Sequence, residues 1–319
     1  MALASMSVVS VSVIVPTHNT RELTLRCLES VGQAPTEAVE IVVVDDGSVD
    51  DTVESVRARF PTARIVCRAT AGGFTAAANA GLRESSGTLM FLLNSDTEIA
   101  PDVIARMRGA FAANPRLGAA GAVLHFPDGQ PQWSGGQEPS SLWIFALATG
   151  VTGLLARLPG YRIVRPLEAA KRGSVKWVNG AAMAIRREAW LQAGALDESF
   201  RFYCQDLDYC LRLGDLGWDV ATITGARVLH HGGATIGKRA GAVEKNYNPE
   251  LLWTDLVRVA EKRHGRRRAR SIARLLRCGG RMRLLARWLV APVFLGERRQ
   301  RWQRDTEAFE RAIKGVSAC

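Results

Sequence analysis

The feature that most constrains the fold of this chain is a short apolar run that ends abruptly in polar and acidic residues. Leu89–Leu93 is uniformly apolar, and Asn94, Ser95 and Asp96 follow it directly. Such a run is typical of a strand buried on both faces, as in a parallel sheet. Because open α/β sheets bind ligands at the carboxyl edge of their strands, we expect Asp96 to lie at such an edge. The alternative is an ordinary aspartate that caps the next turn.

The preceding residues alternate between strand-like and helix-like patterns. Short apolar runs predict strands, and apolar residues at helical spacing behind capping residues predict the helices between them. The strands are expected at 9–15, 40–44, 64–67 and 89–93, and the helices at 20–31, 51–60 and 74–84. Strand alternating with helix predicts an α/β fold with a parallel, right-handed, doubly wound sheet.

All four expected strands end in polar loops. The loops are Pro16-Thr17-His18-Asn19, Asp45-Asp46-Gly47-Ser48, Ala71-Gly72-Gly73 and Asn94-Ser95-Asp96. The chain contains neither the GxGxxG motif of dinucleotide-binding folds nor the GxxxxGK[ST] motif of P-loops. Carboxylate, amide and hydroxyl oxygens suit Mg²⁺ or Mn²⁺, which often bridge proteins to phosphates. We therefore expect a nucleoside diphosphate that is held through one of these ions.

Taken in order, these loops resemble the nucleotide-sugar half of a glycosyltransferase family 2 enzyme with the GT-A fold. Later segments resemble the acceptor half of the rhamnosyltransferase-like branch of that family. They are Asn179–Ala182, Gly194–Glu198, Phe202–Leu213, Gly217-Trp218 and His230–Gly233. The resemblance implies a Rossmann-like, mostly parallel sheet in a domain at 1–240. Its donor half would end at about 125 and its acceptor half would span 126–240, before a basic helical region at 241–319.

The resemblance also implies roles for individual residues. Asp46 would accept a hydrogen bond from a pyrimidine base, on which His18 would pack. Asp96 would bind the metal with the help of His230, and Asp206 would be the catalytic base. The expected donor-binding residues are Pro16, Thr17, His18, Asn19, Asp46, Gly73, Asn94, Ser95, Asn179 and Gly180.

Some of these assignments have ordinary alternatives. Asp46 could be a turn residue and His18 a loop histidine, and His231 competes with His230 for the metal. At Asn179-Gly180 the small residue would let the backbone approach the donor, although a simple tight turn would also need it.

The chain departs from the family pattern beside the expected base and in two of the loops. Gln205 stands where a glutamate is common, Ala71 replaces an asparagine, and Asn94 replaces the first acid of a strict DxD motif. A like-charged neighbour raises the pKa of a carboxyl group, so Gln205 should ease the ionisation of Asp206. Asp208 is the competing candidate for the base. On a helix the two aspartates cannot share a face, and Asp208 would more naturally orient a loop.

The expected chemistry is sugar transfer with inversion. Departure of a nucleoside diphosphate develops negative charge that a metal ion stabilises, and a carboxylate takes the proton of the attacking hydroxyl. One base without an enzyme nucleophile gives inversion in a single step. We expect a sugar, with dTDP-rhamnose as the candidate donor, to be added to a lipid-linked glycan during cell-surface polysaccharide assembly. A nucleotidyltransferase and a non-catalytic sugar-nucleotide-binding module are the alternatives.

Basic charge is concentrated near the C-terminus. Residues 258–304 contain sixteen Lys and Arg against two acidic residues, whereas the rest of the chain has 26 against 29. The apolar residues of this region are massed at 288–295 instead of being interleaved with the arginines, which favours an anionic membrane surface over nucleic acid. A helical appendage with a solvated basic face, or an oligomer interface, is the alternative.

The remaining features concern the compartment. Six cysteines without a CxxC pair indicate reduced thiols, and the apolar run at 8–15 is too short for a signal peptide, so we expect a cytoplasmic protein that is peripheral on the inner face of the cell membrane. The segment 142–158 is apolar but interrupted by Gly150 and Gly153, and is shorter than a membrane span. It could be a core helix pair, an acceptor lid or an interfacial segment.

Overall fold

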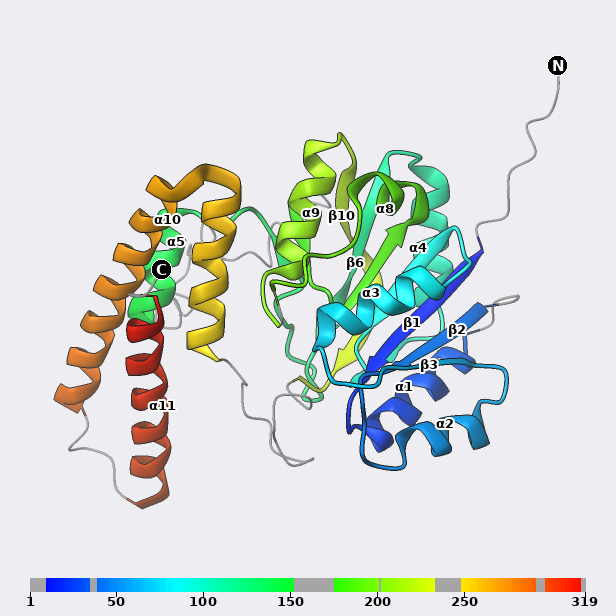
Figure 1. The fold of residues 1–319 in the computed structure, drawn as a ribbon, viewed down its shortest axis with the longest axis horizontal. Helices are drawn as coiled ribbons and strands as arrows, with labels where there is room; N and C mark the ends of the chain where they lie inside the picture. Colours follow the sequence, from blue (N-terminus) through cyan, green and yellow to red (C-terminus); the bar gives the residue numbers. More distant parts are fainter. Residues whose placement is uncertain are drawn as a thin grey trace. The chain divides into compact units, whose positions relative to one another are not determined.

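The computed structural model of the 319-residue chain describes residues 10–34, 39–151, 175–200, 202–232, 248–290 and 296–316. The chain forms two compact units. The first comprises Met1–Gln137 with Pro166–Asn246, and the second comprises Glu138–Arg165 with Tyr247–Cys319. The first unit is an α/β structure and the second is helical (Figure 1).

The first unit is built around an eight-stranded sheet in the order β3-β2-β1-β4-β9-β6-β10-β5. Its strands are β1 Val11–Thr17, β2 Val39–Asp45, β3 Arg64–Cys67, β4 Leu89–Leu93, β5 Thr97–Ile99, β6 Leu117–His125, β9 Ala182–Arg186 and β10 Asp219–His230. Strands β3, β2, β1 and β4 run parallel, as do β6 and β10, whereas β9 and β5 are antiparallel to their neighbours. The expected mostly parallel α/β sheet is confirmed. A small second sheet pairs β7 Gly135–Gly136 with β8 Trp177–Val178.

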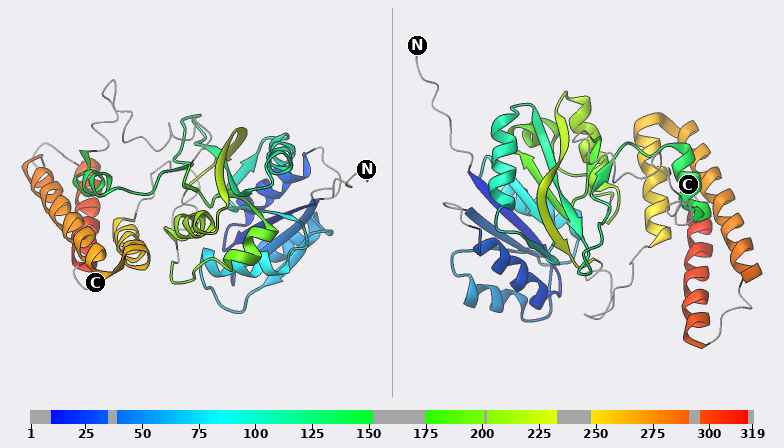
Figure 2. Two further views of the ribbon diagram at one scale, coloured as in Figure 1. Left: turned by 90° about the horizontal axis from the view of Figure 1, so that it is seen from above. Right: turned by 180° about the vertical axis from the view of Figure 1, so that it is seen from behind.

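Helices cover both faces of the sheet (Figure 2). They are α1 Arg21–Gly32, α2 Thr52–Arg59, α3 Phe74–Glu84, α4 Val103–Ala113, α8 Arg187–Ala193 and α9 Gln205–Asp215. Successive side chains of a strand point to opposite faces. Val13 and Val15 of β1 accordingly belong to the core that contains residues of α1, α2 and α4, while Ile14 faces α3. Burial on both faces explains why these strands are continuous apolar runs.

Strand β5 is the element that the sequence did not predict. β4 is buried along its whole length and ends at Leu93, after which the chain turns and pairs Thr97–Ile99 with β10. Helix α4 then follows, with Asp102 at its N-cap position. Because Thr97 lies opposite His230, the residues just before β5 lie beside the end of β10.

The second unit consists of helices from two distant stretches of the chain. They are α5 Ser141–Thr149, α10 Pro249–Val290 and α11 Gly296–Gly315. Their shared core includes Ile144 of α5, Trp253 and Leu276 of α10, and Phe309 of α11. α10 bends at Gly265, whose φ of 77° and ψ of 173° are not helical, and Figure 1 shows the bend where the helix changes from yellow to orange.

The second unit differs from the expected division at residue 240. Of the described residues before 240, those at 138–151 belong to it, because α5 packs against α10. For Ser141–Thr149 the structure therefore agrees with the core interpretation, whereas 152–158 lie outside the described residues. Along the described ranges, no helix combines the length and apolar content needed to cross a bilayer. The five described cysteines are free thiols, of which Cys67 and Cys278 are exposed.

The close contact between α3 and the sheet generates a prediction about stability. A Cβ added at Gly81 would lie 2.3 Å from Cγ2 of Ile14 and 2.8 Å from Cγ2 of Val44, so the neighbouring strands would have to move. We expect Gly81→Ala to lower the free energy of unfolding by roughly 1–3 kcal/mol, the usual range for an overpacked core. Urea titration of the full chain measures this value.

Gly109 provides the matched control, because it also lies inside a helix of the first unit but has nothing within 4 Å of an added Cβ. Gly109→Ala should leave stability unchanged or raise it by up to about 1 kcal/mol, since alanine is the better helix former. If both variants behave alike, the close approach of α3 to β1 and β2 is wrong.

Candidate active site

The end of β1 is joined to the loop after β4 by a network of hydroxyl groups. Oγ1 of Thr17 lies 2.7 Å from Oγ1 of Thr24 and 3.0 Å from Oγ1 of Thr20. Oγ1 of Thr20 in turn lies 2.9 Å from Oγ of Ser95, and all four residues are buried. The expected donor residues Thr17 and Ser95 are thus brought together, and Pro16 precedes them in β1.

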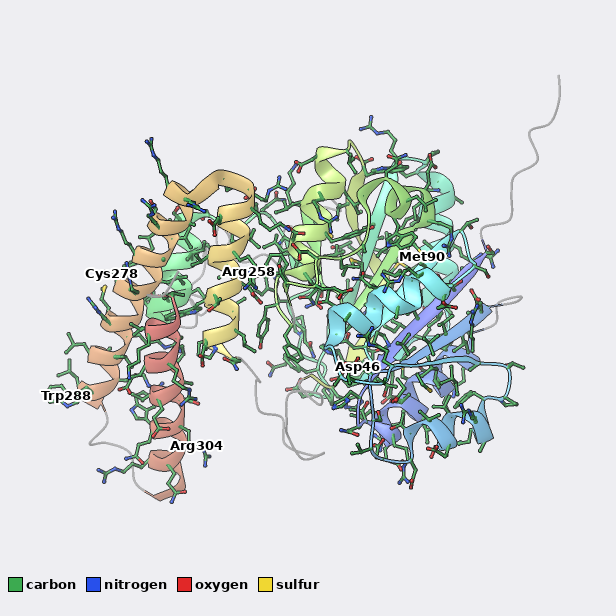
Figure 3. The ribbon with its side chains drawn as sticks, in the orientation of Figure 1. Asp46, Met90, Arg258, Cys278, Trp288 and Arg304 are labelled. Carbon is green, nitrogen blue, oxygen red and sulfur yellow. The ribbon has the colours of Figure 1, made fainter. Side chains whose placement is uncertain are left out.

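Asp46 is held by the third loop and by an arginine. Its buried carboxylate accepts hydrogen bonds from the backbone N–H of Gly72 (3.0 Å) and of Gly73 (2.8 Å), and from Nε of Arg68 (2.8 Å). Gly73 has a φ of 88°, which favours glycine, and it is the N-cap of α3. Sequence reasoning missed Arg68, although a cation directly after a strand was a visible signal. Figure 3 shows Asp46 at the arrowhead end of β1.

His18 and Asn19 complete the edge beside Asp46. Nδ1 of His18 lies 2.9 Å from the backbone oxygen of Asp46, and Nε2 lies 3.1 Å from Nδ2 of Asn19. Asn19 has a φ of 52°, and its side-chain oxygen accepts a hydrogen bond from the N–H of Val49. Both nitrogens of the imidazole are therefore held in place. The ring lies next to Asp46, the carboxylate that the resemblance assigns to binding the pyrimidine base.

Asp96 and His230 meet at the edge between β5 and β10. Oδ1 of Asp96 lies 3.3 Å from Nε2 of His230, and both side chains are mostly buried. The backbone oxygen of Asp96 accepts a hydrogen bond from the N–H of His231. The ring of His231 is turned elsewhere, with Nε2 lying 2.8 Å from Oε1 of Glu98. Of the two candidate histidines, the one that faces Asp96 is therefore His230.

Gln132 fixes the orientation of His230, and sequence reasoning missed it. Nε2 of Gln132 donates to the backbone oxygen of His230 (2.5 Å), while Oε1 lies 2.8 Å from Nδ1 of the same histidine. A backbone oxygen and an amide oxygen only accept hydrogen bonds, so Nδ1 must carry the proton of the neutral ring. Nε2 then presents its lone pair to Asp96, which is the form of histidine that binds metals.

The pair fits two positions around a divalent ion. Adjacent ligands of an octahedral ion with bonds of about 2.1 Å lie roughly 3.0 Å apart, close to the 3.3 Å between Asp96 and His230. Oδ1 of Asn94, nearby in the same loop, is buried without a hydrogen-bond partner among the described residues. Those residues contain no group of three or more His, Cys, Asp or Glu placed to hold a metal. Further ligands would have to come from other oxygens, such as phosphates.

Asp206 lies in the first turn of α9, where backbone N–H groups bind its carboxylate. Its carboxylate accepts hydrogen bonds from the N–H of Gly180 (2.9 Å) and of Leu207 (2.8 Å). Burial raises the pKa of the Asp206 carboxyl above its ordinary value, and these hydrogen bonds oppose the rise. A carboxylate of this kind holds a proton more strongly than an exposed one, which suits it to act as a base.

Asp208 occupies a different environment on the same helix. Its carboxylate accepts from Nε of Arg212 at 3.1 Å. The same guanidinium donates to the backbone oxygens of Ala193 and Ala195. Asp208 therefore orients the loop after α8, as we expected from its position in the helix.

The turn at Asn179–Ala182 connects these groups. The N–H of Gly180 bonds to Asp206, and the oxygen of Ala181 accepts from the N–H of Asn94 at 2.9 Å. Nδ2 of Asn179 donates to the backbone oxygen of Trp133, which fixes the turn on its other side. One turn thus connects the expected catalytic base Asp206 to the loop that carries Asp96, through one hydrogen bond on each side.

Comparison with known proteins adds a family and a fold. The family model described as Glycosyl transferase family 2 matches residues 12–192. The chain is 31% identical over 231 residues to the N-acetylglucosaminyl-diphospho-decaprenol L-rhamnosyltransferase of Mycobacterium tuberculosis, covering 67% of this chain and 73% of that one. It is 26% identical over 242 residues to the O-antigen biosynthesis protein RfbC of Myxococcus xanthus, covering 73% of this chain and 18% of that one.

Solved structures share the fold at low sequence identity. A mannosyltransferase from Pyrobaculum calidifontis in complex with GDP-Man and Mn²⁺ has a TM-score of 0.60 at 17% identity, covering 97% of this chain and 86% of that one. GalNAc-T7 with UDP, GalNAc and Mn²⁺ has a TM-score of 0.59 at 17% identity, covering 80% and 48%. Both support the GT-A type of sheet that the resemblance implied.

The burial of Asp206 predicts how stability depends on pH. The folded protein binds this proton more tightly than the unfolded chain does, so ionisation of Asp206 costs stability as the pH rises from the ordinary carboxyl pKa through the raised one. Asp206→Asn removes that cost. Its free energy of unfolding relative to wild type should therefore increase as the pH rises above the ordinary carboxyl pKa of about 4, by roughly 1.4 kcal/mol per unit of pKa shift. Urea titrations at several pH values test this, and a difference that stays constant or falls contradicts it.

Proposed function

This chain belongs to glycosyltransferase family 2, and on that basis we propose that it is an inverting, metal-dependent enzyme. It transfers a sugar from a nucleoside diphosphate to a hydroxyl group of a glycan acceptor. The observation that supports this best is the turn around Gly180, which bonds both to Asp206 and to the loop that carries Asp96. A base and a metal-binding acid held by one turn suit a single displacement, in which the hydroxyl attacks as the diphosphate leaves.

The donor would bind along the edge formed by the loops after β1, β2, β3 and β4. Asp46 would accept a hydrogen bond from the nucleobase of the donor. The contacts with Arg68, Gly72 and Gly73 hold its carboxylate in one orientation. His18 would pack on the same nucleobase. Such preorganisation reduces the entropy lost on binding. The other donor contacts proposed are Pro16, Thr17, Asn19, Gly73, Asn94, Ser95, Asn179 and Gly180.

Asp96 and His230 would hold the Mg²⁺ or Mn²⁺ ion. When bound, the ion would stabilise the negative charge that develops on the departing diphosphate. Gln132 selects the tautomer of the neutral His230 ring in which Nδ1 carries the hydrogen and Nε2 is directed at Asp96, which is the arrangement a cation would need. Asp206 would take the proton of the attacking hydroxyl. Because burial raises its pKa, it is a stronger base than an exposed aspartate.

The relatives suggest the sugar and the acceptor. One of them is named as a rhamnosyltransferase acting on N-acetylglucosaminyl-diphospho-decaprenol, and another is named for O-antigen biosynthesis. We propose that this enzyme transfers rhamnose to a lipid-linked glycan in the assembly of a cell-surface polysaccharide. Such an acceptor would place the enzyme in the cytoplasm, as a peripheral protein on the inner face of the cell membrane.

Replacement of the proposed base tests the reaction. We expect Asp206→Asn to lower kcat by about 10²-fold or more, the usual scale for loss of a general base, while the donor still binds. The measurement is release of free nucleoside diphosphate together with calorimetric titration of the donor. Asp208→Asn is the matched variant on the same helix and should lose less than about tenfold, because Asp208 bonds to Arg212. Unchanged turnover in Asp206→Asn would reject this base, and release of pyrophosphate would indicate a nucleotidyltransferase.

The two contacts of Gln132 with His230 predict how the chain binds its metal. Replacing Gln132 with leucine removes the acceptor for Nδ1–H and leaves the tautomer of His230 unspecified. We expect Gln132→Leu to weaken Mn²⁺ binding by about 10- to 100-fold, the usual effect of losing a partner of a metal-bound histidine. Asp96→Ala should weaken Mn²⁺ and donor together, because the diphosphate would reach the protein partly through the ion.

Gln130 provides the control, because it lies in the same loop with its side chain exposed. Gln130→Leu should bind Mn²⁺ like the wild type in calorimetric titration. If EDTA does not change donor affinity in the wild type, the metal does not link the donor to the protein. If Gln132→Leu and Gln130→Leu have equal Mn²⁺ affinities, His230 is not positioned by Gln132.

A further inference from the structure

The second part of α10, residues 266–290, has two opposite faces with different surroundings. It follows the bend at Gly265 and packs one face into the core of the second unit. The buried side chains of that face are Ala269, Ile272, Ala273 and Leu276. Their spacing of three and four residues is that of a single helical stripe. The packing of the second unit therefore uses this stripe and leaves the opposite face outward.

The outward face ends in a cluster of large apolar side chains. Met282, Leu285, Trp288 and Leu289 are exposed at 52%, 60%, 72% and 64% of their surfaces. Because they are three, three and one residues apart, they project from one side of the last two turns. Single exposed apolar residues are common on protein surfaces, but four together on two turns indicate a binding surface. We name these four residues the apolar tip.

Arginines occupy the same side of the helix before the apolar tip. Residues 266–290 contain nine arginines and no acidic residue. Arg267, Arg270, Arg274 and Arg281 are exposed, and the helical period places them within the same half of the helix as the tip. Figure 3 shows Cys278, which lies between Arg274 and Arg281 in the chain, on the same side of α10 as Trp288 and away from α11. We name these four arginines the basic segment.

Not every arginine of this helix is available to a partner. Nε of Arg287 donates to Oγ1 of Thr306 and its Nη2 donates to the backbone oxygen of Trp302, so this residue joins α10 to α11. Arg287 is buried, in contrast to the basic segment. Arg283 is also used internally, since its guanidinium lies 3.8 Å from the centre of the Phe309 ring. The helix thus separates arginines that serve internal packing from a set that faces outward with the apolar tip.

The arrangement of the apolar tip and the basic segment indicates the kind of partner. We propose that the outward face of residues 267–289 binds an anionic phospholipid bilayer, with the apolar tip inserted and the basic segment on the headgroups. A bilayer offers negative charge and hydrocarbon in adjacent layers, and tryptophan prefers the boundary between them. Nucleic acid offers the charge without the hydrocarbon. This inference deepens the proposed function, whose lipid-linked acceptor would lie in the same bilayer, but it is argued from the second unit alone.

Binding by the basic segment and binding by the apolar tip should respond differently to salt. Attraction between the basic segment and anionic headgroups is screened within a Debye length, so added salt should weaken it steeply. Insertion of the apolar tip depends on removal of apolar surface from water, which salt does not oppose. Binding should therefore fall with salt to a residual level that the apolar tip supports.

The experiment measures co-sedimentation of the full chain with vesicles of phosphatidylglycerol and phosphatidylcholine, and with vesicles of phosphatidylcholine alone. We expect binding at low salt to the anionic vesicles and much weaker binding to the neutral ones. Arg274→Gln with Arg281→Gln should weaken anionic binding by about 30-fold, since each surface arginine contributes about fivefold. Trp288→Ser with Leu289→Ser should weaken it by about 100-fold and abolish the residual binding at high salt.

Matched controls lie in the first unit. Arg57→Gln with Arg83→Gln removes two exposed arginines there, and Leu191→Ser removes an exposed leucine. These variants should bind vesicles like the wild type, and circular dichroism should show that every variant is folded. The inference is overturned if the wild type ignores anionic vesicles at low salt, or if the tip and segment variants bind like the controls.

Two further outcomes would reassign the face. If the chain is a dimer in solution and the tip variants make it a monomer without affecting vesicle binding, the tip is a protein interface. If the chain binds RNA or DNA with a steep salt dependence and not vesicles, the basic segment is a nucleic-acid site. Transfer to a short water-soluble acceptor distinguishes this inference from the proposed function. If vesicle binding is absent and transfer is normal, only the proposed membrane contact of α10 is wrong. If the wild type does not transfer the sugar, only the proposed reaction is wrong.

Discussion

The antiparallel pairing of the short strand β5 with β10 is the contact on which the candidate site depends. It sets Thr97 opposite His230 and brings together Glu98 and His231, which are 133 residues apart in the chain. The fold itself thereby places the carboxylate of Asp96 beside the ring of His230. Fixing such groups beforehand removes an entropic cost that binding would otherwise carry. A flexible loop in place of β5 would leave the two side chains to be ordered by the metal itself.

Local patterns in the sequence predicted much of the sheet and its polar edge. The run Leu89–Leu93 is buried at every position, and the loops after the first four strands do carry Asp46 and Asp96 at one edge. The missed features depend on partners that are distant in the chain. Thr97–Ile99 has no strand pattern of its own and exists through its pairing with β10. The role of Gln132 likewise follows from where β10 ends, and no local signal in a Gly- and Pro-rich loop indicates it.

Two buried aspartates illustrate how surroundings separate similar side chains. Asp46 is bonded to the guanidinium of Arg68 and to two backbone N–H groups, so its negative charge is matched by a positive one. Asp206 is met by two backbone N–H groups, and burial raises its pKa. A charge-matched carboxylate suits a fixed acceptor of hydrogen bonds, whereas one that holds its proton more strongly suits proton transfer. Neither difference could be read from the two aspartates in the sequence.

The membership of α5 in the second unit determines when that unit can fold during synthesis. α5 has nine residues, too few for a stable isolated helix in water, and its buried residues pack against α10. The ribosome makes α5 about a hundred residues before α10, a delay on the order of ten seconds. During that time Ile144 and Ala148 have no completed core to enter. A nascent chain, or one cut just after residue 247, therefore carries an unfinished apolar segment that a chaperone can recognise, even when the sheet has already folded.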